Sequence, residues 1–379
     1  MDMMDACYHA IDLYITQNIR DFYKDRFISQ VVLHVHELLS LQFDDSELIH
    51  DGIEHALALY YETMICPRTL PQQTIVNVDT DEKLRRIMLK PQPVQRTPEW
   101  YEYRHNLITA SSAYKAFGTQ ASINELICSK CAPLNLQKYS STSTDGPMHW
   151  GVKYEPVSVM YYSYCYKTVV TEYGCIAHDT WSFLGASPDG INTSPLSPLY
   201  GRMLEIKNPY SRVITGIPKN EYWVQCQLQM EVCDLDNCDF LECKFVEYST
   251  YEEYLEDGTV NISKDGCFKG MILHFIKNGL FHYEYSPFQC DPEELERWRE
   301  NLMDTITDMT WCRNIYWKLQ EVSCVLIPRN RPWVESVLPK LKEVWDIILT
   351  ERQDDSWSKR LPKKKNTKTE YDNKIEADL

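Results

Sequence analysis

The first ninety residues carry apolar side chains at helical spacing. Two groups recur three or four residues apart, as on one face of an amphipathic helix: Ala10, Ile11, Tyr14, Ile15, Ile19 and Phe22, then Val31, Val32, Val35, Leu38 and Leu39. A third helix is expected from Leu48 to before Pro67. Residues 67–98, with five prolines and mixed charge, are typical of a linker. We therefore predict an N-terminal helical extension and linker over residues 1–92.

The rest of the chain alternates predicted strands and helices. Strands are expected at 169–176, 180–185, 240–248 and 270–285, the last interrupted by a turn at 277–279. Helices are expected at 221–232, from Asp291 through Trp311 towards Leu319, and at 332–349. This order predicts an α/β domain over residues 93–325 and a C-terminal segment over 326–379. That segment comprises a helix and a basic tail with no core-forming pattern, which we expect to be disordered.

The most informative stretch is 185–207, which predicts a hairpin with a long loop rich in proline, serine and glycine. Side chains alternate along a strand, so Glu205 and Lys207 share one face and point with Asp189 to one place. Two carboxylates form the hard oxygen site that Mg²⁺ or Mn²⁺ prefers, and a lysine there can orient water. The pattern indicates metal-assisted phosphodiester hydrolysis. Taken alone it also fits a turn aspartate and a solvated strand face, because such triplets are common.

An earlier block predicts a phosphate pocket. Thr97 and a proline at the first turn open a helix on which Trp100 and Arg104 lie one turn apart. The stretch 109–112 can cap a second helix whose free N–H groups favour an anion, so Arg104 and Ser111 would flank a phosphate. The plainer alternative is an ordinary salt bridge and an ordinary cap.

Two further polar positions lie on predicted helices. Because proline is tolerated best in a first turn, Pro156 places Glu155 at a helix start, facing the site or merely complementing the helix dipole. Tyr222, Gln225 and Gln229 recur on one face of the helix at 221–232, where buried amides need partners. For Gln229, a face meeting solvent is the alternative.

Four ordered blocks together resemble a known family. The pattern P-D-(loop)-E-x-K over 188–207 is that of the PD-(D/E)XK nucleases. With the blocks at 100–111, 150–155 (WGVKYE) and 222–227 (YWVQCQ), residues 98–234 resemble the lambda-exonuclease or YqaJ-type viral recombinase family. Four ordered blocks are far more specific than one. The resemblance implies a restriction-endonuclease-like α/β core, a mixed central sheet flanked by helices.

The resemblance also implies roles for individual residues. Asp189 and Glu205 would bind Mg²⁺ or Mn²⁺ with Glu155 as a more distant carboxylate, Lys207 would orient water, and Gln225 would contact the reacting phosphate. The residues expected to grip a 5′-terminal phosphate or DNA are Arg104, Ser111, Ser187 and Trp100. The implied activity is a 5′-to-3′ exonuclease on double-stranded DNA that leaves 3′ single strands for recombination or repair. An endonuclease or flap nuclease on the same core, or a catalytically silent DNA-binding subunit, stays an open alternative.

Composition limits the partners. Hydrophobic residues make up 44% and charged residues 25% of the chain, and no long uncharged apolar run predicts a membrane span. The acidic start lacks the features of a secretory signal, so we expect a protein inside the cell, in the cytoplasm or nucleus of an infected cell if viral. Fourteen cysteines are then expected to be reduced, and the lone CxxC at 128–131 is weak grounds for zinc or iron–sulfur.

The formal net charge of −16 argues against a protein that coats DNA. It does not exclude a local basic lining beside an acidic site that a metal neutralises. The expected partner is a double-stranded DNA end, and a single-strand annealing protein is a second candidate. The family is known for ring-shaped trimers that enclose DNA, and additions of this size leave open whether this chain forms one.

Overall fold

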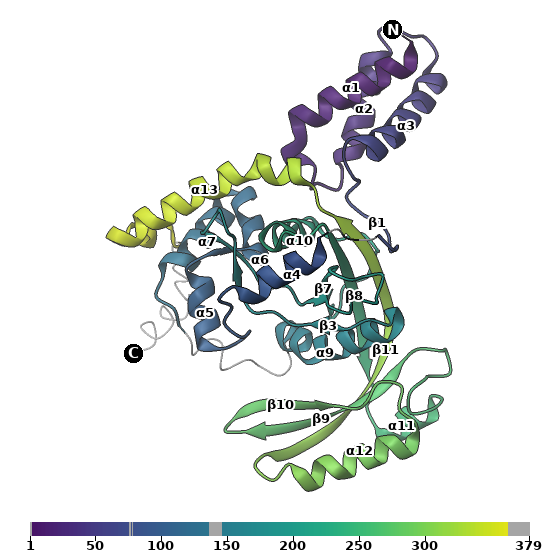
Figure 1. The fold of residues 1–379 in the computed structure, drawn as a ribbon, viewed down its shortest axis with the longest axis vertical. Coiled ribbons are helices and arrows are strands. Elements are labelled where there is room, and N and C mark those ends of the chain that lie inside the picture. Colours follow the sequence, from purple (N-terminus) through teal and green to yellow (C-terminus); the bar gives the residue numbers. More distant parts are fainter. Residues whose placement is uncertain (1, 76, 78, 136–145, 363–379) are drawn as a thin grey trace, which may run out of the picture.

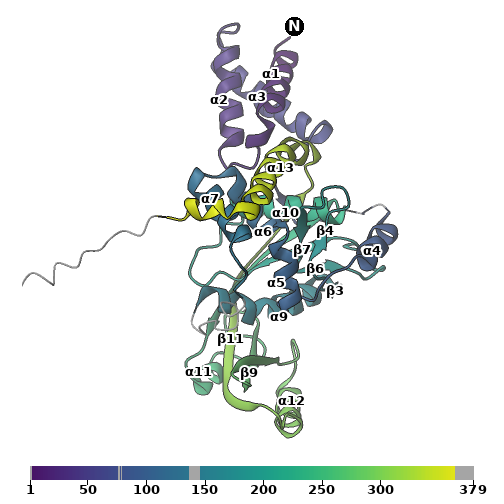
Figure 2. The same cartoon turned by 90° about the vertical axis from the view of Figure 1, so that its left-hand side faces the viewer.

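The computed structural model describes residues 2–75, 77, 79–135 and 146–362. Figure 1 shows a helical N-terminal part, a central α/β body and, at the opposite end, an extension of the sheet. The turned view in Figure 2 keeps this order along the long axis. Residues 136–145 and the basic tail from 363, which was expected to be disordered, lie outside the described residues. No helix within the described ranges is long and apolar enough to cross a membrane.

The N-terminal extension is helical, as predicted. Its helices are α1 (Met3–Asn18), the short η1 (Ile19–Asp21), α2 (Phe27–Leu39) and α3 (Ser46–Thr63). Their apolar faces form one core that includes Ile11, Val35 and Ile53. Phe22, just after η1, connects this core to the α/β body, because its ring centroid lies 5.9 Å from that of Trp223 in the body.

A mixed sheet organises the body, which confirms the predicted α/β class. Its strand order is β10-β9-β11-β8-β7-β6-β3, with β1 paired to β11. The strands are β1 (Leu70–Pro71), β3 (Val170–Thr171), β6 (Gly190–Asn192), β7 (Met203–Lys207), β8 (Asn237–Glu247), β9 (Lys269–Lys277), β10 (Leu280–Tyr285) and β11 (Thr310–Pro328). Strands β7 and β8 run parallel, whereas the other pairs are antiparallel. A second sheet joins β2 (Ile108–Thr109), β5 (Leu184–Ala186) and β4 (Ile176–Ala177).

Helices cover both faces of the sheet. Helix α9 (Pro147–Tyr166) packs on the face that carries Leu204 and Ile206. Helix α10 (Asn220–Cys233) packs on the face that carries Met203 and Phe240. The other helices are α4 (Thr80–Leu89), α5 (Pro98–His105), α6 (Ala110–Ala113), η2 (Tyr114–Phe117), α7 (Gln120–Cys131), α11 (Tyr251–Glu256), α12 (Pro292–Thr305), α13 (Arg331–Asp354) and η3 (Ser356–Arg360).

The stretch 67–98 is more ordered than a linker. Helix α4 lies within it, and its Leu84 and Ile87 are buried in the main core. Gly201 has a φ of +76°, and an added Cβ would lie 2.4 Å from the Thr80 side chain, so the helix start packs directly on the loop before β7. The sequence analysis missed this short amphipathic helix because the stretch is rich in proline and two buried apolar residues are too few to form a recognisable helical pattern.

The prediction that the helix from Asp291 runs towards Leu319 is wrong. Helix α12 ends at Thr305, and 310–328 is the longest strand, β11. Ile315, Trp317 and Leu319 are buried at every second position, which is the period of a strand. Strand β11 pairs with β9 along its first half and with β8 along its second, so it joins the body to the extension.

Helix α9 also begins earlier than predicted. It starts at Pro147, which occupies the first turn that was assigned to Pro156, and Pro156 lies inside the helix. Glu155 is therefore in the middle of α9 and cannot complement the dipole of a first turn.

Trp333 at the start of α13 fastens the N-terminal helices to the body. Its side chain is fully buried, its ring lies 4.9 Å from Trp223, and its Nε1–H donates to the Arg20 carbonyl at 3.3 Å. Trp333→Ala is expected to lower the free energy of unfolding by about 3–5 kcal/mol, because it leaves a large cavity. Urea denaturation measures this. Trp311→Ala, at a position 46% exposed, should cost less than about 1 kcal/mol; equal losses would contradict the assignment.

Candidate active site

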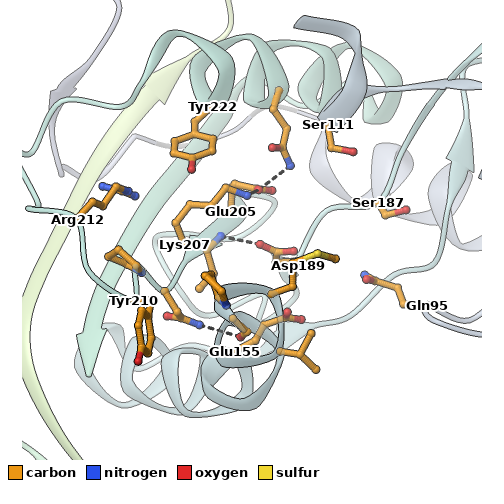
Figure 3. A pocket seen from close by; sticks show the side chains of 18 of the residues that line it. Gln95, Ser111, Glu155, Ser187, Asp189, Glu205, Lys207, Tyr210, Arg212 and Tyr222 are labelled. Atoms are coloured by element: carbon orange, nitrogen blue, oxygen red, sulfur yellow. Dashed lines mark hydrogen bonds and ion pairs between the residues drawn. The ribbon is translucent and has the colours of Figure 1, made fainter. Parts of the chain in front are cut away.

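The predicted residues line one cleft of about 600 Å³ beside the β6–β7 hairpin. In Figure 3, Asp189, Glu205 and Lys207 lie together at its centre, with Ser111 and Ser187 to one side and Tyr210 and Arg212 to the other. The lining residues named by the sequence are Trp100, Arg104, Ser111, Glu155, Ser187, Asp189, Glu205, Lys207 and Gln225. The structure thus brings all nine together.

The β6–β7 hairpin positions the central residues. Asp189 directly precedes β6, and Gly190 pairs with Leu204 across the antiparallel strands. The backbone N–H of Ile206 donates to Asp189 Oδ2 at 2.7 Å, which fixes that carboxylate against β7. Glu205 and Lys207 share a face of β7 as predicted, and their side chains form an ion pair.

Helix α10 holds the Glu205 carboxylate. Gln225 Nε2 donates to Glu205 Oε1 at 2.6 Å, and Gln229 Nε2 donates to Glu205 Oε2 at 2.8 Å. Gln229 is 1% exposed, so the alternative that it faces solvent is wrong. Gln227 points elsewhere and donates to the Pro328 carbonyl at 2.8 Å. Each carboxylate oxygen of Glu205 therefore has an amide donor, as a buried charge requires.

Glu155 faces the cleft from the middle of α9. Its Oε2 accepts from Arg96 Nη2 at 2.6 Å. Arg96 has a φ of +66°, the left-handed region that a non-glycine residue seldom adopts. The third carboxylate is thus neutralised by an arginine that the sequence patterns did not indicate.

Crowded carboxylates shift the proton equilibria. Burial raises the pKa of the Asp189 carboxyl well above its usual range, and the charges of Glu205 and Glu155 raise it further. Burial also raises the pKa of Glu155, which Arg96 opposes. Burial alone would lower the pKa of Lys207, but the charges of Glu205 and Asp189 outweigh it and raise the pKa. Lys207 therefore stays protonated, whereas Asp189 lacks sufficient positive charge nearby.

The predicted phosphate pocket forms one wall of the cleft. Arg104 Nη1 donates to Ser187 Oγ at 3.1 Å, and its Nη2 donates to Ser111 Oγ at 3.0 Å. The guanidinium lies 4.1 Å from the Trp100 ring centroid, and Trp100 Nε1–H donates to Ser187 Oγ at 3.2 Å. A planar guanidinium flanked by two hydroxyls is suited to bind the oxygens of a phosphate group. The second helix predicted here is the single turn α6, so the side chains dominate the pocket.

The oxygen donors fit Mg²⁺ or Mn²⁺. Within the described ranges no three His, Cys, Asp or Glu side chains gather closely enough to enclose a metal. Mg²⁺ does not need such a cage, because it keeps several waters and uses one or two carboxylates. Asp189 and Glu205 supply those carboxylates at the cleft floor, and the raised pKa of Asp189 indicates a place where a cation would be stabilising.

Two arginines near the cleft escaped the sequence patterns, which had named Tyr222 but neither Arg212 nor Arg352. Arg212 forms an ion pair with the buried Glu242, and the Tyr222 ring lies beside Lys207, whose Nζ is 5.1 Å from the ring centroid. Arg352 near the end of α13 donates to the carbonyls of His105 at 2.8 Å and Lys130 at 2.6 Å, so it ties together the ends of α5 and α7. Only the spacing of Tyr222 from Gln225 gave a local signal; the arginines pair across long stretches of chain.

Comparison with known proteins identifies a family match for the middle of the chain. Residues 99–236 match the YqaJ-like viral recombinase domain, which confirms the resemblance over this segment. An uncharacterized protein of Acanthamoeba polyphaga mimivirus is 32% identical over 304 residues, covering 69% of this chain and 54% of the relative. This chain thus spans about half the length of that relative.

Three solved structures show a distant likeness. An alkaline exonuclease of Laribacter hongkongensis is 19% identical with a TM-score of 0.39, and 20% identical with 0.41 in its complex with dAMP; each covers 69% of this chain and 98% of that one. A phage-related exonuclease from Haemophilus somnus is 12% identical with a TM-score of 0.35, covering 66% of this chain and 96% of that one.

The raised pKa of Asp189 predicts a pH-dependent cost to stability. A carboxyl whose folded pKa lies above its unfolded value of about 3.9 loses stability as the pH rises between the two. Asp189→Asn removes that loss and keeps an oxygen for the Ile206 N–H. In EDTA at pH 8 the variant should therefore unfold at a higher temperature than the wild type, with the difference vanishing near pH 4. Thermal unfolding followed by circular dichroism measures it; a variant less stable at pH 8 would contradict the argument.

Proposed function

We propose that this chain, whose residues 99–236 match the YqaJ-like viral recombinase domain, is a metal-dependent deoxyribonuclease. Its expected action is digestion of double-stranded DNA from 5′ ends, which leaves 3′ single strands for recombination or repair. The observation that carries the proposal is that one cleft contains both the Asp189–Glu205–Lys207 group and the Arg104–Ser111–Ser187 group. The first group suits phosphodiester hydrolysis and the second suits a terminal phosphate.

Each polar group at the cleft floor has a distinct task in this proposal. Bound Mg²⁺ or Mn²⁺ would stabilise negative charge on the phosphate and acidify a water. Gln225 and Gln229 keep the Glu205 carboxylate in one orientation. Lys207, paired with Glu205, would orient the attacking water and stabilise developing negative charge. Glu155, held by Arg96, contributes a more distant charge.

The Arg104 pocket would give the enzyme its preference for ends. A phosphate inside a DNA strand is a monoanionic diester flanked by sugars, whereas a 5′-terminal phosphate offers three free oxygens and up to two charges. Two hydroxyls and a guanidinium on one wall of the cleft match that larger set of acceptors. Binding of a terminal phosphate there would place a nearby phosphodiester bond over Asp189 and Glu205, which favours an exonuclease over an endonuclease.

The acidic composition is compatible with this activity. A net charge of −16 weakens non-specific attraction to DNA, so binding must come from local cations such as Arg104, Lys207 and Arg212 around the cleft. A protein that only binds DNA gains nothing from placing carboxylates against a polyanion. We therefore prefer an active nuclease to a silent subunit. A single-strand annealing partner and a ring-shaped trimer stay predictions.

Lys207→Ala should abolish most of the cleavage. Wild-type protein with Mg²⁺ is expected to shorten linear duplex DNA carrying 5′ phosphates and to leave a closed circle intact, with no reaction in EDTA. The variant should be about 100–10,000-fold slower, which is the usual loss when a side chain that assists proton transfer or stabilises charge in the transition state is removed. Lys342→Ala, which removes an exposed lysine paired with Asp346, is the matched control and should keep the wild-type rate.

The outcomes separate the alternatives. Cutting of the closed circle at a similar rate would retain the nuclease and reject end recognition. No cleavage of either DNA by the wild type would contradict the proposal.

Arg104→Gln should remove the preference for phosphorylated ends. Hydrogen bonds to a charged group contribute about 1.5–3 kcal/mol, so kcat/KM on 5′-phosphorylated duplex should fall about 10- to 100-fold. The rate on 5′-hydroxyl ends should change little. Arg85→Gln, at an exposed arginine paired with Glu82 on α4, controls for loss of one positive charge. Equal losses on both kinds of end would show that Arg104 does not read the terminal phosphate.

A further inference from the structure

The sheet extension presents a row of polar and aromatic side chains towards α9. Across β10, β9 and β11, Tyr283 pairs with His274 and His274 pairs with Arg313, so the three share one face. Phe281 lies two residues from Tyr283 and therefore on this face as well, 5.3 Å from the His274 ring. We call Phe281, Tyr283, His274 and Arg313 the inner row.

The inner row continues from the cleft. His149 in the first turn of α9 bonds the Tyr283 hydroxyl at 2.5 Å, and its ring lies 5.4 Å from that of Phe281. Its neighbour Met148 lines the cleft, as do Gly151 and Val152 further along the same helix. Six helical residues separate His149 from Glu155, which is about 9 Å. His149, which contacts the row, therefore lies about 9 Å from Glu155 along the helix, or two to three nucleotides at the roughly 3.4 Å spacing of one strand of B-DNA.

The inner row is suited to a polyanion. Arg313 is exposed and makes no hydrogen bond or ion pair within the described residues. His274 is 5% exposed, and neither of its ring nitrogens has a hydrogen-bond partner in the described part of the chain. Glu247, whose charge acts on Tyr283, is paired with Lys153. The exposed Arg313 guanidinium can therefore donate to a phosphate oxygen, with the buried His274 ring beneath it.

The opposite face of the extension has the reverse character. There α12 packs on Met271, Leu273 and Phe275 and presents acidic residues to solvent, as its sequence EELERWRENLMDT indicates. Because charges on the two faces differ, a nucleic acid strand would be drawn to the inner row alone.

Exposed apolar side chains decide which form of DNA fits. Phe281 is 37%, Val152 39% and Met148 76% exposed between the cleft and the row. The charged phosphate backbone of a duplex gains little from contact with apolar side chains, whereas unpaired bases can stack on them. We propose that the inner row and the first turn of α9 bind the single strand that remains after cleavage. This inference rests on the proposed function, since that activity produces the strand.

The test measures binding without catalysis. Fluorescence anisotropy of a labelled 15-nucleotide oligo(dT) in EDTA reports affinity for single strands in the full-length protein. Phe281→Ala should weaken binding about tenfold, as for one lost stacking partner. Arg313→Gln should weaken it and lower the slope of log affinity against log salt by about 0.7, whereas Arg313→Lys should keep that slope. Leu280→Ala, which truncates an exposed apolar side chain next to Phe281 on the other face of β10, and Arg297→Gln, which removes an exposed arginine on α12, are the controls and should bind like the wild type.

The outcomes keep this inference apart from the proposed nuclease. Cleavage by the wild type together with unchanged oligonucleotide binding by Phe281→Ala and Arg313→Gln would overturn the inference and leave the nuclease standing. Equal losses in the Leu280→Ala and Arg297→Gln controls, or a change in oligomeric state by sedimentation in place of a change in affinity, would also overturn it. Selective losses in the two inner-row variants together with cleavage by the wild type would support the inference, whereas selective losses without cleavage would show single-strand binding and reject the nuclease.

Discussion

A buried carboxylate with three donors is the constraint around which the molecule is built. Glu205 is fully buried on β7, and its charge is tolerable only because Lys207, Gln225 and Gln229 all bond it. Those donors fix the rotation of α10 relative to the sheet, since both glutamines must point at one strand position. The same face of α10 closes one side of the cleft. Stability and chemistry therefore depend on the same few bonds, and the raised pKa of Asp189 indicates a cost that a cation would relieve.

The parts outside the matched segment support the cleft from two ends. Helix α13 starts at Trp333, buried against the N-terminal helices, and carries Arg352 near its other end, where it binds the carbonyls that terminate α5 and α7. Helix α5 presents Trp100 and Arg104, so a C-terminal helix braces the wall of the candidate phosphate pocket. At the far end, β11 continues the body sheet into the extension that carries the inner row.

The sequence patterns correctly predicted the features that depend on the periodicity of a single strand or helix. The period of two over 204–207 placed Glu205 and Lys207 on one face, and the helical spacing of Gln225 and Gln229 put both amides on one side. The same reasoning failed where distant contacts decide. Residues 311–319 were assigned to a helix because a strong cap at Asp291 preceded them, yet pairing with β8 and β9 makes them a strand. Arg96 meets Glu155 across 59 residues and Arg352 meets His105 across 247, and no spacing rule announces such pairs.

The proposed nuclease depends above all on a divalent metal site formed by Asp189 and Glu205 together. Isothermal titration calorimetry of Mn²⁺ into metal-free protein at pH 8 measures binding at this site without DNA or turnover. Mn²⁺ should bind saturably to the wild type and not to Glu205→Gln, with circular dichroism confirming that the variant is folded. Absence of saturable binding to the wild type, or undiminished binding to a folded Glu205→Gln, would contradict it.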